Sequence, residues 1–276
     1  MQDKQYLKRN KMDYAVIGYP IKHSYSPFIH NTNFKLNEDD FFYDKLEVTP
    51  ESLSNIRNIM NEKDLQGINV TVPHKEMIIP YLDYVNGHGR TIKAVNTVKR
   101  VEGKLYGYNT DVSGYKKTII DNHFKHENVL ILGAGGAAKA VLLAHQELGS
   151  NVTIVARRKE SFETFKNKEF NAITIDQFDG GEFDIVINAT PLGLNNEDPF
   201  KVFKLYLLSN LTNTVGYDLI YNPAVTPFMT YFNKSINGLD MLVNQAMLSY
   251  EIWTGKGGNK EAVKSTLKQF LEENHE

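Results

Sequence analysis

A lysine and an aspartate in the first half of the chain carry side chains that could move a proton. Lys75 closes the segment Asn69-Val70-Thr71-Val72-Pro73-His74-Lys75, which runs from an apolar strand pattern into the start of a helix. The positive end of that helix would disfavour the charged ammonium and so favour proton transfer. Asp111 follows the last strand pattern of this half, where its carboxylate could orient the lysine. The pair could exchange a proton with a substrate hydroxyl; alternatively, Lys75 is a solvated lysine and Asp111 a helix cap.

Two serines near the amino terminus could bind a carboxylate. Ser24 and Ser26 flank Tyr25 directly before Pro27, at the expected start of a helix. Free backbone amides and the helix dipole attract an anion at such a place, and the two hydroxyls can add hydrogen bonds. The alternative is that Ser26 only caps the helix.

A glycine-rich segment in the middle of the chain is typical of dinucleotide binding. It lies between a strand pattern at residues 129–132 and a helix, with the spacing G-x-G-x-x-A. The first glycine would make the tight turn, the second would let the backbone approach a pyrophosphate, and the last small residue would pack the helix on the strand. Contacts to the cofactor are therefore expected from Gly133, Ala134, Gly135, Gly136 and Ala137. A turn that is glycine-rich for steric reasons alone is the other interpretation.

The segment after the next strand indicates which dinucleotide is bound. An NAD-specific domain carries an acidic residue there for the ribose hydroxyls, whereas this chain has Arg157, Arg158 and Lys159. Three cations suit a 2′-phosphate, so NADP is favoured over NAD. The alternative is a solvated basic loop.

Short apolar runs alternate with helical patterns along the chain. In the first half, strands are expected at residues 14–18, near 41–43, at 68–72 and, as a hairpin around Glu102-Gly103, at 94–98 and 104–108, with helices from Ser26 and over 112–122. In the second half, strands are expected at 129–132, 152–155, 185–188 and 215–219, and helices after Thr226-Pro227, over 239–253 and over 260–273. The alternation predicts an α/β protein of two domains with a sheet in each.

The composition excludes several classes of protein. The 276 residues are 41% hydrophobic and 23% charged, as in a globular protein with a sizeable core. A formal net charge of −2 gives no general attraction to nucleic acid or to an anionic membrane, and the absence of cysteine excludes thiol chemistry. The first dozen residues lack the apolar core of a signal peptide, and no apolar run is long enough to span a membrane. A cytoplasmic protein without a nucleic-acid or membrane partner is expected.

Together these motifs resemble the shikimate dehydrogenase family, from Tyr14 to Trp253. The resemblance is carried by separated segments in one order: Val16-Ile17-Gly18-Tyr19-Pro20-Ile21-Lys22-His23-Ser24-Tyr25-Ser26-Pro27, Asn69-Val70-Thr71-Val72-Pro73-His74-Lys75, Ala94-Val95-Asn96-Thr97, Asn109-Thr110-Asp111, the glycine turn, Asn188-Ala189-Thr190-Pro191-Leu192-Gly193, Tyr221-Asn222-Pro223 and Asn237-Gly238-Leu239-Asp240-Met241-Leu242-Val243-Asn244-Gln245-Ala246.

The resemblance implies reversible NADPH-dependent reduction of 3-dehydroshikimate to shikimate, a step toward chorismate and the aromatic amino acids. It implies a substrate domain with a mixed sheet over residues 12–111, completed by helices at about 240–276, and a Rossmann-like NADP-binding domain over 112–239. Lys75 would be the acid/base, and Ser24 and Ser26 would hold the substrate carboxylate. Ring contacts are implied for Thr71, Asn96, Asp111, Tyr221 and Gln245, and nicotinamide contacts for Leu219 and Gly238. The expected assembly is a monomer or a homodimer, with no metal.

The chain departs from the family at a few positions. Ala156-Arg157-Arg158 replaces the family's usual Asn-Arg-Thr, Ser161 stands where a further arginine is expected, Lys93 where glycine is general and Gly87 where an acidic residue is common. Two other functions are compatible with the same residues. A quinate or quinate/shikimate dehydrogenase using NAD would need the same carboxylate and diol contacts. A non-catalytic metabolite sensor would keep the two domains, but the presence of both Lys75 and Asp111 argues against it.

Overall fold

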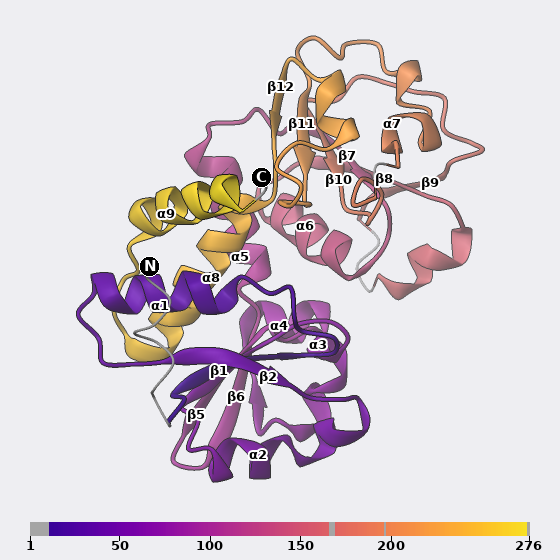
Figure 1. Cartoon of the computed structure of the whole chain (residues 1–276). Coiled ribbons are helices and arrows are strands. Elements are labelled where there is room, and N and C mark those ends of the chain that lie inside the picture. Colours follow the sequence, from indigo (N-terminus) through magenta and orange to yellow (C-terminus); the bar gives the residue numbers. More distant parts are fainter. Residues whose placement is uncertain (1–10, 166–168, 196, 275–276) are drawn as a thin grey trace. The chain divides into compact units, whose positions relative to one another are not determined.

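The computed structural model describes residues 11–165, 169–195 and 197–274, which divide into two compact units (Figure 1). The first unit comprises Met1–Thr110 together with Gln245–Glu276, and the second comprises Asp111–Asn244. The helix α8 (Leu239–Thr254) begins in the second unit and ends in the first. The first unit is therefore assembled from both ends of the chain.

The first unit is built on a six-stranded mixed sheet in the order β2-β1-β3-β5-β6-β4. β2 and β3 run parallel to β1 on either side of it, whereas β5 is antiparallel to β3. The β5–β6 hairpin turns at Glu102 and Gly103, which have φ angles of 49° and 75°, as a tight two-residue hairpin turn requires. The strands are β1 (Tyr14–Gly18), β2 (Tyr43–Glu47), β3 (Gly67–Val70), β4 (Tyr84–Val85), β5 (Thr97–Val101) and β6 (Lys104–Tyr108).

Helices cover both faces of this sheet, and β1 shows why. Ala15 and Ile17 join one apolar cluster with α2 (Ile56–Glu62), while Tyr14 and Val16 join another with Phe34 of α1 (Ser26–Leu36). Because successive side chains of a strand point to opposite faces, all of β1 is buried. The other short helices of this unit are the 3₁₀ helices η1 (Glu51–Asn55) and η2 (Ile79–Tyr81), and α3 (His74–Met77) and α4 (Gly87–Ile92).

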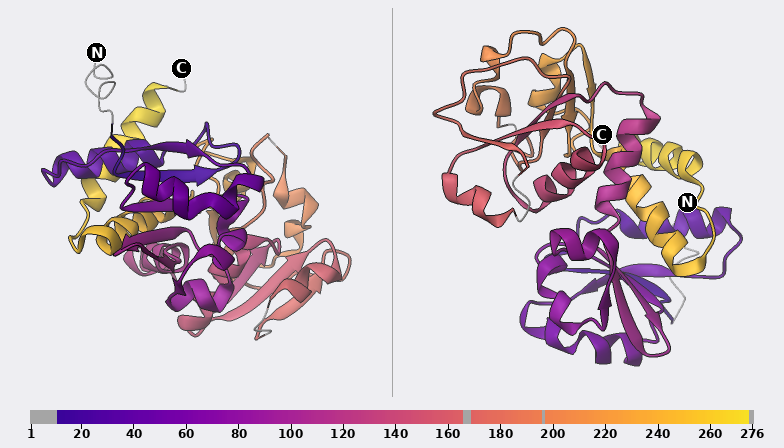
Figure 2. Two further views of the ribbon diagram at one scale, coloured as in Figure 1. Left: turned by 90° about the horizontal axis from the view of Figure 1, so that it is seen from below. Right: turned by 180° about the vertical axis from the view of Figure 1, so that it is seen from behind.

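The last two helices pack on the first unit, with α9 (Lys260–Glu273) beside α1 (Figure 2). The ring centroids of Phe28 and Phe270 lie 4.4 Å apart across that contact. On α8, the indole N–H of Trp253 donates to the carbonyl of Val98 at 3.0 Å. A β-carbon on Gly67 would lie 2.4 Å from the same indole nitrogen, so only glycine fits at the start of β3.

Three strands of this unit differ in their bounds from the sequence prediction, and the sequence does not predict the two-residue strand β4. β3 covers Gly67–Val70 instead of residues 68–72. The strand expected near residues 41–43 begins at Tyr43, because Phe42 bonds through its N–H to the Asp13 side chain at 2.9 Å. The strand expected from residue 94 begins at Thr97, because Val95 donates instead to the carbonyl of Lys75. Lys93 has a φ of 53° and ends α4 in the left-handed conformation that glycine adopts most easily.

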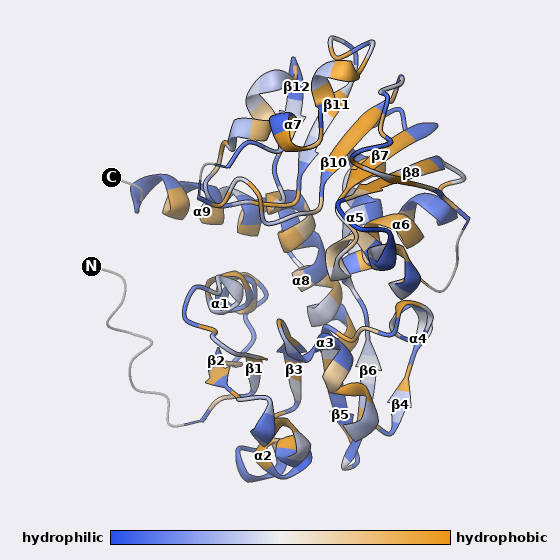
Figure 3. Cartoon of the chain, turned by 90° about the vertical axis from the view of Figure 1, so that its right-hand side faces the viewer, coloured by the Kyte–Doolittle hydropathy of each residue, from blue (hydrophilic) through white to orange (hydrophobic). Residues whose placement is uncertain are grey.

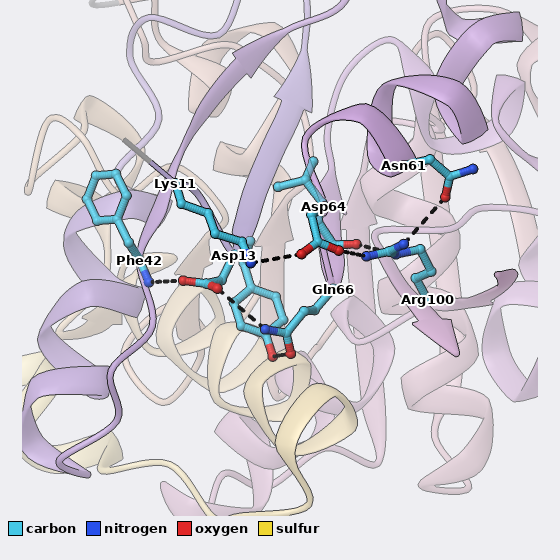
Figure 4. Close-up of polar contacts among 9 residues, drawn as sticks. Lys11, Asp13, Phe42, Asn61, Asp64, Gln66 and Arg100 are labelled. Carbon is cyan, nitrogen blue, oxygen red and sulfur yellow. Dashed lines mark hydrogen bonds and ion pairs between the residues drawn. The ribbon is translucent and has the colours of Figure 1, made fainter. Parts of the chain in front are cut away.

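A group of exposed polar contacts ties the amino-terminal end of β1 to the loop before β3 (Figure 4). Asp64 accepts from Lys11 at 2.8 Å and from Arg100 at 2.6 Å. Gln66 donates to Asp13 at 3.4 Å. Exposed ion pairs of this kind contribute about 0–1 kcal/mol each, so the group aligns the strand ends more than it stabilises the fold.

The second unit is built on a six-stranded, all-parallel sheet in the order β12-β11-β10-β7-β8-β9. The chain passes outward from β7 to β9 and then returns to the other side of β7 at β10, so the strand order reverses between β7 and β10. Figure 3 shows these central strands as mainly hydrophobic, as burial on both faces requires. The strands are β7 (Asn128–Leu132), β8 (Asn151–Ala156), β9 (Asn171–Thr174), β10 (Ile185–Asn188), β11 (Val215–Asp218) and β12 (Lys234–Ile236).

The sequence does not predict either edge strand of this sheet. β9 and β12 are brief and partly exposed, so neither leaves an apolar run in the sequence. The helix expected after Thr226-Pro227 is the single 3₁₀ segment η5 (Pro227–Tyr231), and Thr226 forms no side-chain cap on it. The helices are α5 (Asp111–Asp121), α6 (Gly136–Glu147), η3 (Lys159–Thr164), α7 (Pro199–Val202) and η4 (Leu205–Leu207). Within the described ranges, no helix has the length and apolar character needed to cross a membrane.

Candidate active site

In the first unit, two serine hydroxyls lie side by side where the loop after β1 enters α1. The hydroxyls of Ser24 and Ser26 are 3.1 Å apart, and the N–H of Ser26 donates to the hydroxyl of Ser24 at 3.2 Å. The alternative in which Ser26 caps α1 is wrong, because Ser26 is the first residue of the helix and Tyr25 occupies the N-cap position. The N–H of Ser26 is instead bonded to the hydroxyl of Ser24. Both side chains are half-buried. The Ser26 hydroxyl is therefore not consumed by capping.

The segment that carries Thr71 and Lys75 is fixed by its backbone. β3 ends at Val70, and Thr71 then donates its N–H to the carbonyl of Ile17 at 2.9 Å. His74 is buried, with its Nε2 2.6 Å from the carbonyl of Val48. The carbonyl of the half-buried Lys75 accepts the N–H of Val95 at 2.7 Å. α3 has only four residues, so its dipole is much smaller than that of the longer helix expected from the sequence.

A buried amide and hydroxyl network lies next to this segment and joins β3, β5 and α8. The side-chain N–H₂ of Asn69 donates to Ser249 at 3.0 Å, and its oxygen accepts from the Tyr43 hydroxyl at 2.8 Å. Asn96 accepts the N–H of Thr110 at 2.8 Å and donates toward Gln245 at 3.4 Å. The structure thus brings together Asn96 and Gln245, two of the residues expected to contact the substrate ring.

Sequence reasoning missed part of this network. The motif at residues 69–75 contains Asn69, but the sequence does not predict a role for it. No pattern in the sequence indicates Ser249, whose hydroxyl lies 2.7 Å from that of Thr97. The only available signal was the polar pair Asn96-Thr97 inside an otherwise apolar stretch. Asn69, Thr97 and Ser249 are themselves buried, and they orient the half-buried polar side chains next to them.

In the second unit, the glycine turn has the geometry that its sequence predicts. Gly133 has a φ of 95°, and a β-carbon there would lie 2.6 Å from the Thr190 side chain. Gly135 and Gly136 are exposed, and a β-carbon on either would meet nothing within 4 Å. α6 starts at Gly136 and the buried Ala138 packs it on the sheet, so the amides of its first turn are accessible to an anion.

The basic segment lies at the same edge of the sheet as this turn. β8 pairs in parallel with β7, and Gly133 donates its N–H to the carbonyl of Val155 at 2.8 Å. Arg157, Arg158 and Lys159 follow the end of β8 and are exposed. Within the described residues, none of the three forms an ion pair, so their charge is available to a ligand.

A buried aspartate organises the loops at the ends of β10 and β11. Asp218 accepts from the Thr226 hydroxyl at 2.6 Å, from the Asn188 side chain at 3.0 Å and from the N–H of Ile220 at 3.0 Å. Burial raises the pKa of Asp218 above its ordinary range, against the effect of these three donors. The carbonyl of Leu219 comes so close to Gly238 that a β-carbon there would lie 2.1 Å from it. Leu219 and Gly238, both expected at the nicotinamide, are therefore neighbours.

Replacing Thr226 with valine is expected to destabilise the protein by about 1–3 kcal/mol near neutral pH, because ionised Asp218 then loses a charge-assisted donor. A raised pKa means that the carboxyl stabilises the fold fully below its ordinary pKa of 3.8 and less as the pH rises through the raised value. The loss in the variant should accordingly shrink as the pH falls toward about 4. Urea unfolding at both pH values measures it, with Thr230→Val at an exposed hydroxyl as control. A loss that is equal at both pH values would contradict this role of Asp218.

The remaining expected residues occupy defined places. Asp111 is the first residue of α5 and is half-buried, and Tyr221 follows β11 and is half-buried as well. Ala134 and Ala137 lie in the glycine turn and in the first turn of α6. In the part of the chain that the structure describes, no group of three His, Asp or Glu side chains is arranged to hold a metal ion.

The two units together define a class of protein. An all-parallel sheet with a glycine turn and a basic segment at one edge is the fold of a dinucleotide-binding domain, and its combination with a mixed-sheet unit is typical of two-domain dinucleotide-dependent oxidoreductases. The chain belongs to the shikimate dehydrogenase family. Residues 16–98 match the model of the shikimate dehydrogenase substrate binding domain, and residues 238–268 match that of the shikimate 5′-dehydrogenase C-terminal domain.

Individual relatives agree over nearly the full length. The chain is 43% identical to the shikimate dehydrogenase (NADP(+)) of Staphylococcus haemolyticus over 272 residues, which cover 93% of this chain and 99% of the relative. It is similar to the crystal structure of shikimate dehydrogenase 1 from Peptoclostridium difficile, with a TM-score of 0.83 and 31% identity over 94% of this chain and 98% of the other. The shikimate 5-dehydrogenase of Thermus thermophilus in complex with NADP(H) and shikimate has the same TM-score of 0.83 at 28% identity, over 94% and 99%.

Proposed function

We propose that this protein is a shikimate dehydrogenase that reduces 3-dehydroshikimate to shikimate reversibly with NADPH, on the way to chorismate and the aromatic amino acids. The observation that carries the proposal is the 43% identity over nearly the whole chain to a relative named for this activity with NADP(+). A structural relative holds NADP(H) and shikimate together in a fold of the same kind.

The first unit supplies groups suited to a polyhydroxylated carboxylate. Ser24 and Ser26 hold the substrate carboxylate with their adjacent hydroxyls. Asn96 and Gln245, oriented by the buried network, bind ring hydroxyls, as does Thr71. We propose further ring contacts from Asp111 and Tyr221, which belong to the second unit. We assign residues 12–111 and about 240–276 to this substrate domain, and residues 112–239 to the NADP-binding domain.

The chemistry assigned to the side chains is one proton transfer. NADPH, when bound, supplies the hydride that the carbonyl carbon accepts. As the carbonyl oxygen gains negative charge, the Lys75 ammonium gives it a proton, which completes the new hydroxyl, and Asp111 orients the lysine. In the oxidative direction Lys75 accepts the hydroxyl proton.

The second unit carries the groups for the cofactor. The amides of Gly133, Ala134, Gly135, Gly136 and Ala137 bind the pyrophosphate, since the turn is exposed and opens α6. Arg157, Arg158 and Lys159 bind the 2′-phosphate. Leu219 and Gly238 border the nicotinamide. We further propose that the protein acts in the cytoplasm as a monomer or a homodimer, without a nucleic-acid partner.

The decisive experiment is an assay of the purified protein with shikimate and quinate, each with NADP⁺ and with NAD⁺. We expect the highest kcat/KM for shikimate with NADP⁺. A large preference for quinate with NAD⁺ would replace the proposal by its nearest rival. If shikimate binds but is not oxidised under any of these conditions, the protein is a metabolite sensor and not an enzyme.

Replacing Arg157 with alanine is expected to raise the KM for NADP⁺ about tenfold and to leave the KM for shikimate nearly unchanged, because a bond to the 2′-phosphate would be lost. Steady-state kinetics with each substrate varied in turn measures both constants. NAD⁺, which lacks that phosphate, is the internal control, and its KM should not rise. Equal increases for NADP⁺ and shikimate would mean that the segment has only a structural role.

A further inference from the structure

A lysine beneath the loop that carries Ser24 has no role in the reaction described above. Lys45 lies on β2, in register with Val16 of β1. It shares a strand face with Tyr43, whose ring stacks on that of His30 of α1 with the centroids 4.4 Å apart. The Lys45 side chain therefore rises on the α1 side of the sheet, near the edge where β1 and β2 both end.

The ammonium of Lys45 donates a hydrogen bond to the carbonyl of Lys22. Lys22 stands two positions before Ser24, in the loop that the N–H of Ser24 closes by donating to the carbonyl of Ile21 at 3.2 Å. A fixed positive charge thus supports the loop from which one of the two proposed carboxylate-binding hydroxyls projects.

This charge is not neutralised within the described chain. Lys45 is half-buried, and no ion pair joins its ammonium to a carboxylate of the described residues. Asp44 points to the opposite face and uses one oxygen to accept the Lys45 N–H at 2.7 Å. Glu47 shares the face of Lys45 but is exposed. Lys22 is exposed in the same loop and adds a second positive charge close to Ser24 in the sequence.

We infer that Lys45 is a positioning residue for the substrate carboxylate: it holds the loop of Ser24 through the Lys22 carbonyl and adds a positive charge behind the serine hydroxyls. The inference rests on the proposed function. The charge acts on substrate and product alike, because both carry the same carboxylate. It therefore lowers KM and leaves the hydride step unchanged.

The test compares Lys45→Met with Lys45→Arg and with a matched control, Lys99→Met. Methionine has an unbranched side chain that is one atom shorter than that of lysine and carries no charge, and arginine keeps the charge. Lys99 also donates to a backbone carbonyl, that of Ile252 at 2.8 Å, but it lies in register with Gly67 at the other end of the sheet. Kinetics are measured at saturating NADP⁺ with shikimate and with its uncharged methyl ester.

For Lys45→Met we expect the KM for shikimate to rise about three- to tenfold, with kcat changed less than about twofold. The KM for the methyl ester should rise clearly less, and both Lys45→Arg and Lys99→Met should resemble the wild type. An unchanged KM, an equal rise for the ester, or an equal rise in Lys99→Met would overturn the inference. If Lys45→Met fails to fold by circular dichroism, Lys45→Gln is measured in its place with the same criteria.

Turnover and binding of shikimate by the wild-type protein distinguish a failure of this inference from a failure of the proposed function. Wild-type turnover of shikimate combined with an unaltered Lys45→Met removes only the role of Lys45. A wild type that neither oxidises nor binds shikimate removes the proposed function, and the inference with it.

Discussion

Replacing Lys75 with alanine is expected to lower kcat for shikimate oxidation by about 10²- to 10⁴-fold, with the KM for shikimate changed less than about threefold. A group that transfers a proton acts in the transition state, so its removal slows the step without removing the bonds that bind the ground state. The Lys75 backbone is held by the Val95 N–H and lies next to the buried His74, so the variant should keep the local fold.

Steady-state kinetics and a thermal unfolding curve measure this effect. Lys104→Ala is the control, since Lys104 is an exposed lysine of the same unit that stacks over the Tyr84 ring at 5.9 Å. Turnover in Lys75→Ala close to that of the wild type would refute the acid/base role. A kcat that falls together with the unfolding temperature would point to a structural role instead.

The sequence predicts most of the fold because its signals are local. The strands at the centre of the parallel sheet are continuous apolar runs, and β10 occurs at the expected residues, Ile185–Asn188. The hairpin of β5 and β6 is marked by Glu102-Gly103, whose turn needs two positive φ angles. The helix α9 also has its expected bounds, Lys260–Glu273, because its apolar residues recur with helical spacing.

What the sequence does not predict depends on contacts between distant segments. The edge strands β9 and β12 are short and partly exposed, so tertiary pairing defines them rather than a hydrophobic pattern. β2 lies later than expected because the Asp13 carboxylate holds the Phe42 N–H outside the strand. Thr226 has the appearance of a helix cap, but its hydroxyl bonds to the buried Asp218 instead.

At the candidate active site, too, some features have local sequence signals and others depend on contacts between distant segments. Motif spacing predicts the glycine turn between β7 and α6, where the structure has it. The same kind of signal predicts Ser24, Ser26 and Lys75 as site residues, in the segments that follow β1 and β3. The sequence marks the network around Asn69 only weakly, through the polar pair Asn96-Thr97, since the partners Tyr43 and Ser249 are far from Asn69 along the chain. Hydrogen bonds on both sides of Asn69 fix its side chain, which orients the neighbouring polar groups before a substrate binds. A site that is already ordered loses less conformational entropy on binding, so binding costs less free energy.

Gly238 lies directly before α8, against the backbone of Leu219. Replacing it with alanine is expected to destabilise the protein by about 3 kcal/mol and to raise the KM for NADP⁺ several-fold. The added methyl group would lie 2.1 Å from the Leu219 carbonyl oxygen, which is backbone and cannot rotate away as a side chain would. Gly238 is also bonded on both sides: its N–H donates to Ile220 at 3.0 Å, and its carbonyl accepts from Leu242 at 2.9 Å in the first turn of α8.

The backbone must therefore move at Leu219 or at the start of α8, and the proposed nicotinamide contacts move with it. Thermal and urea unfolding measure the loss of stability, and kinetics measures the KM for NADP⁺. Gly257→Ala is the matched control, because a β-carbon there would meet nothing within 4 Å and the residue does not need a positive φ. A Gly238→Ala protein as stable as this control would contradict the prediction, because it would show that the backbone at Leu219 or at the start of α8 moves at little cost in free energy. A destabilised variant with normal kinetics would separate the packing role of Gly238 from the proposed cofactor contact.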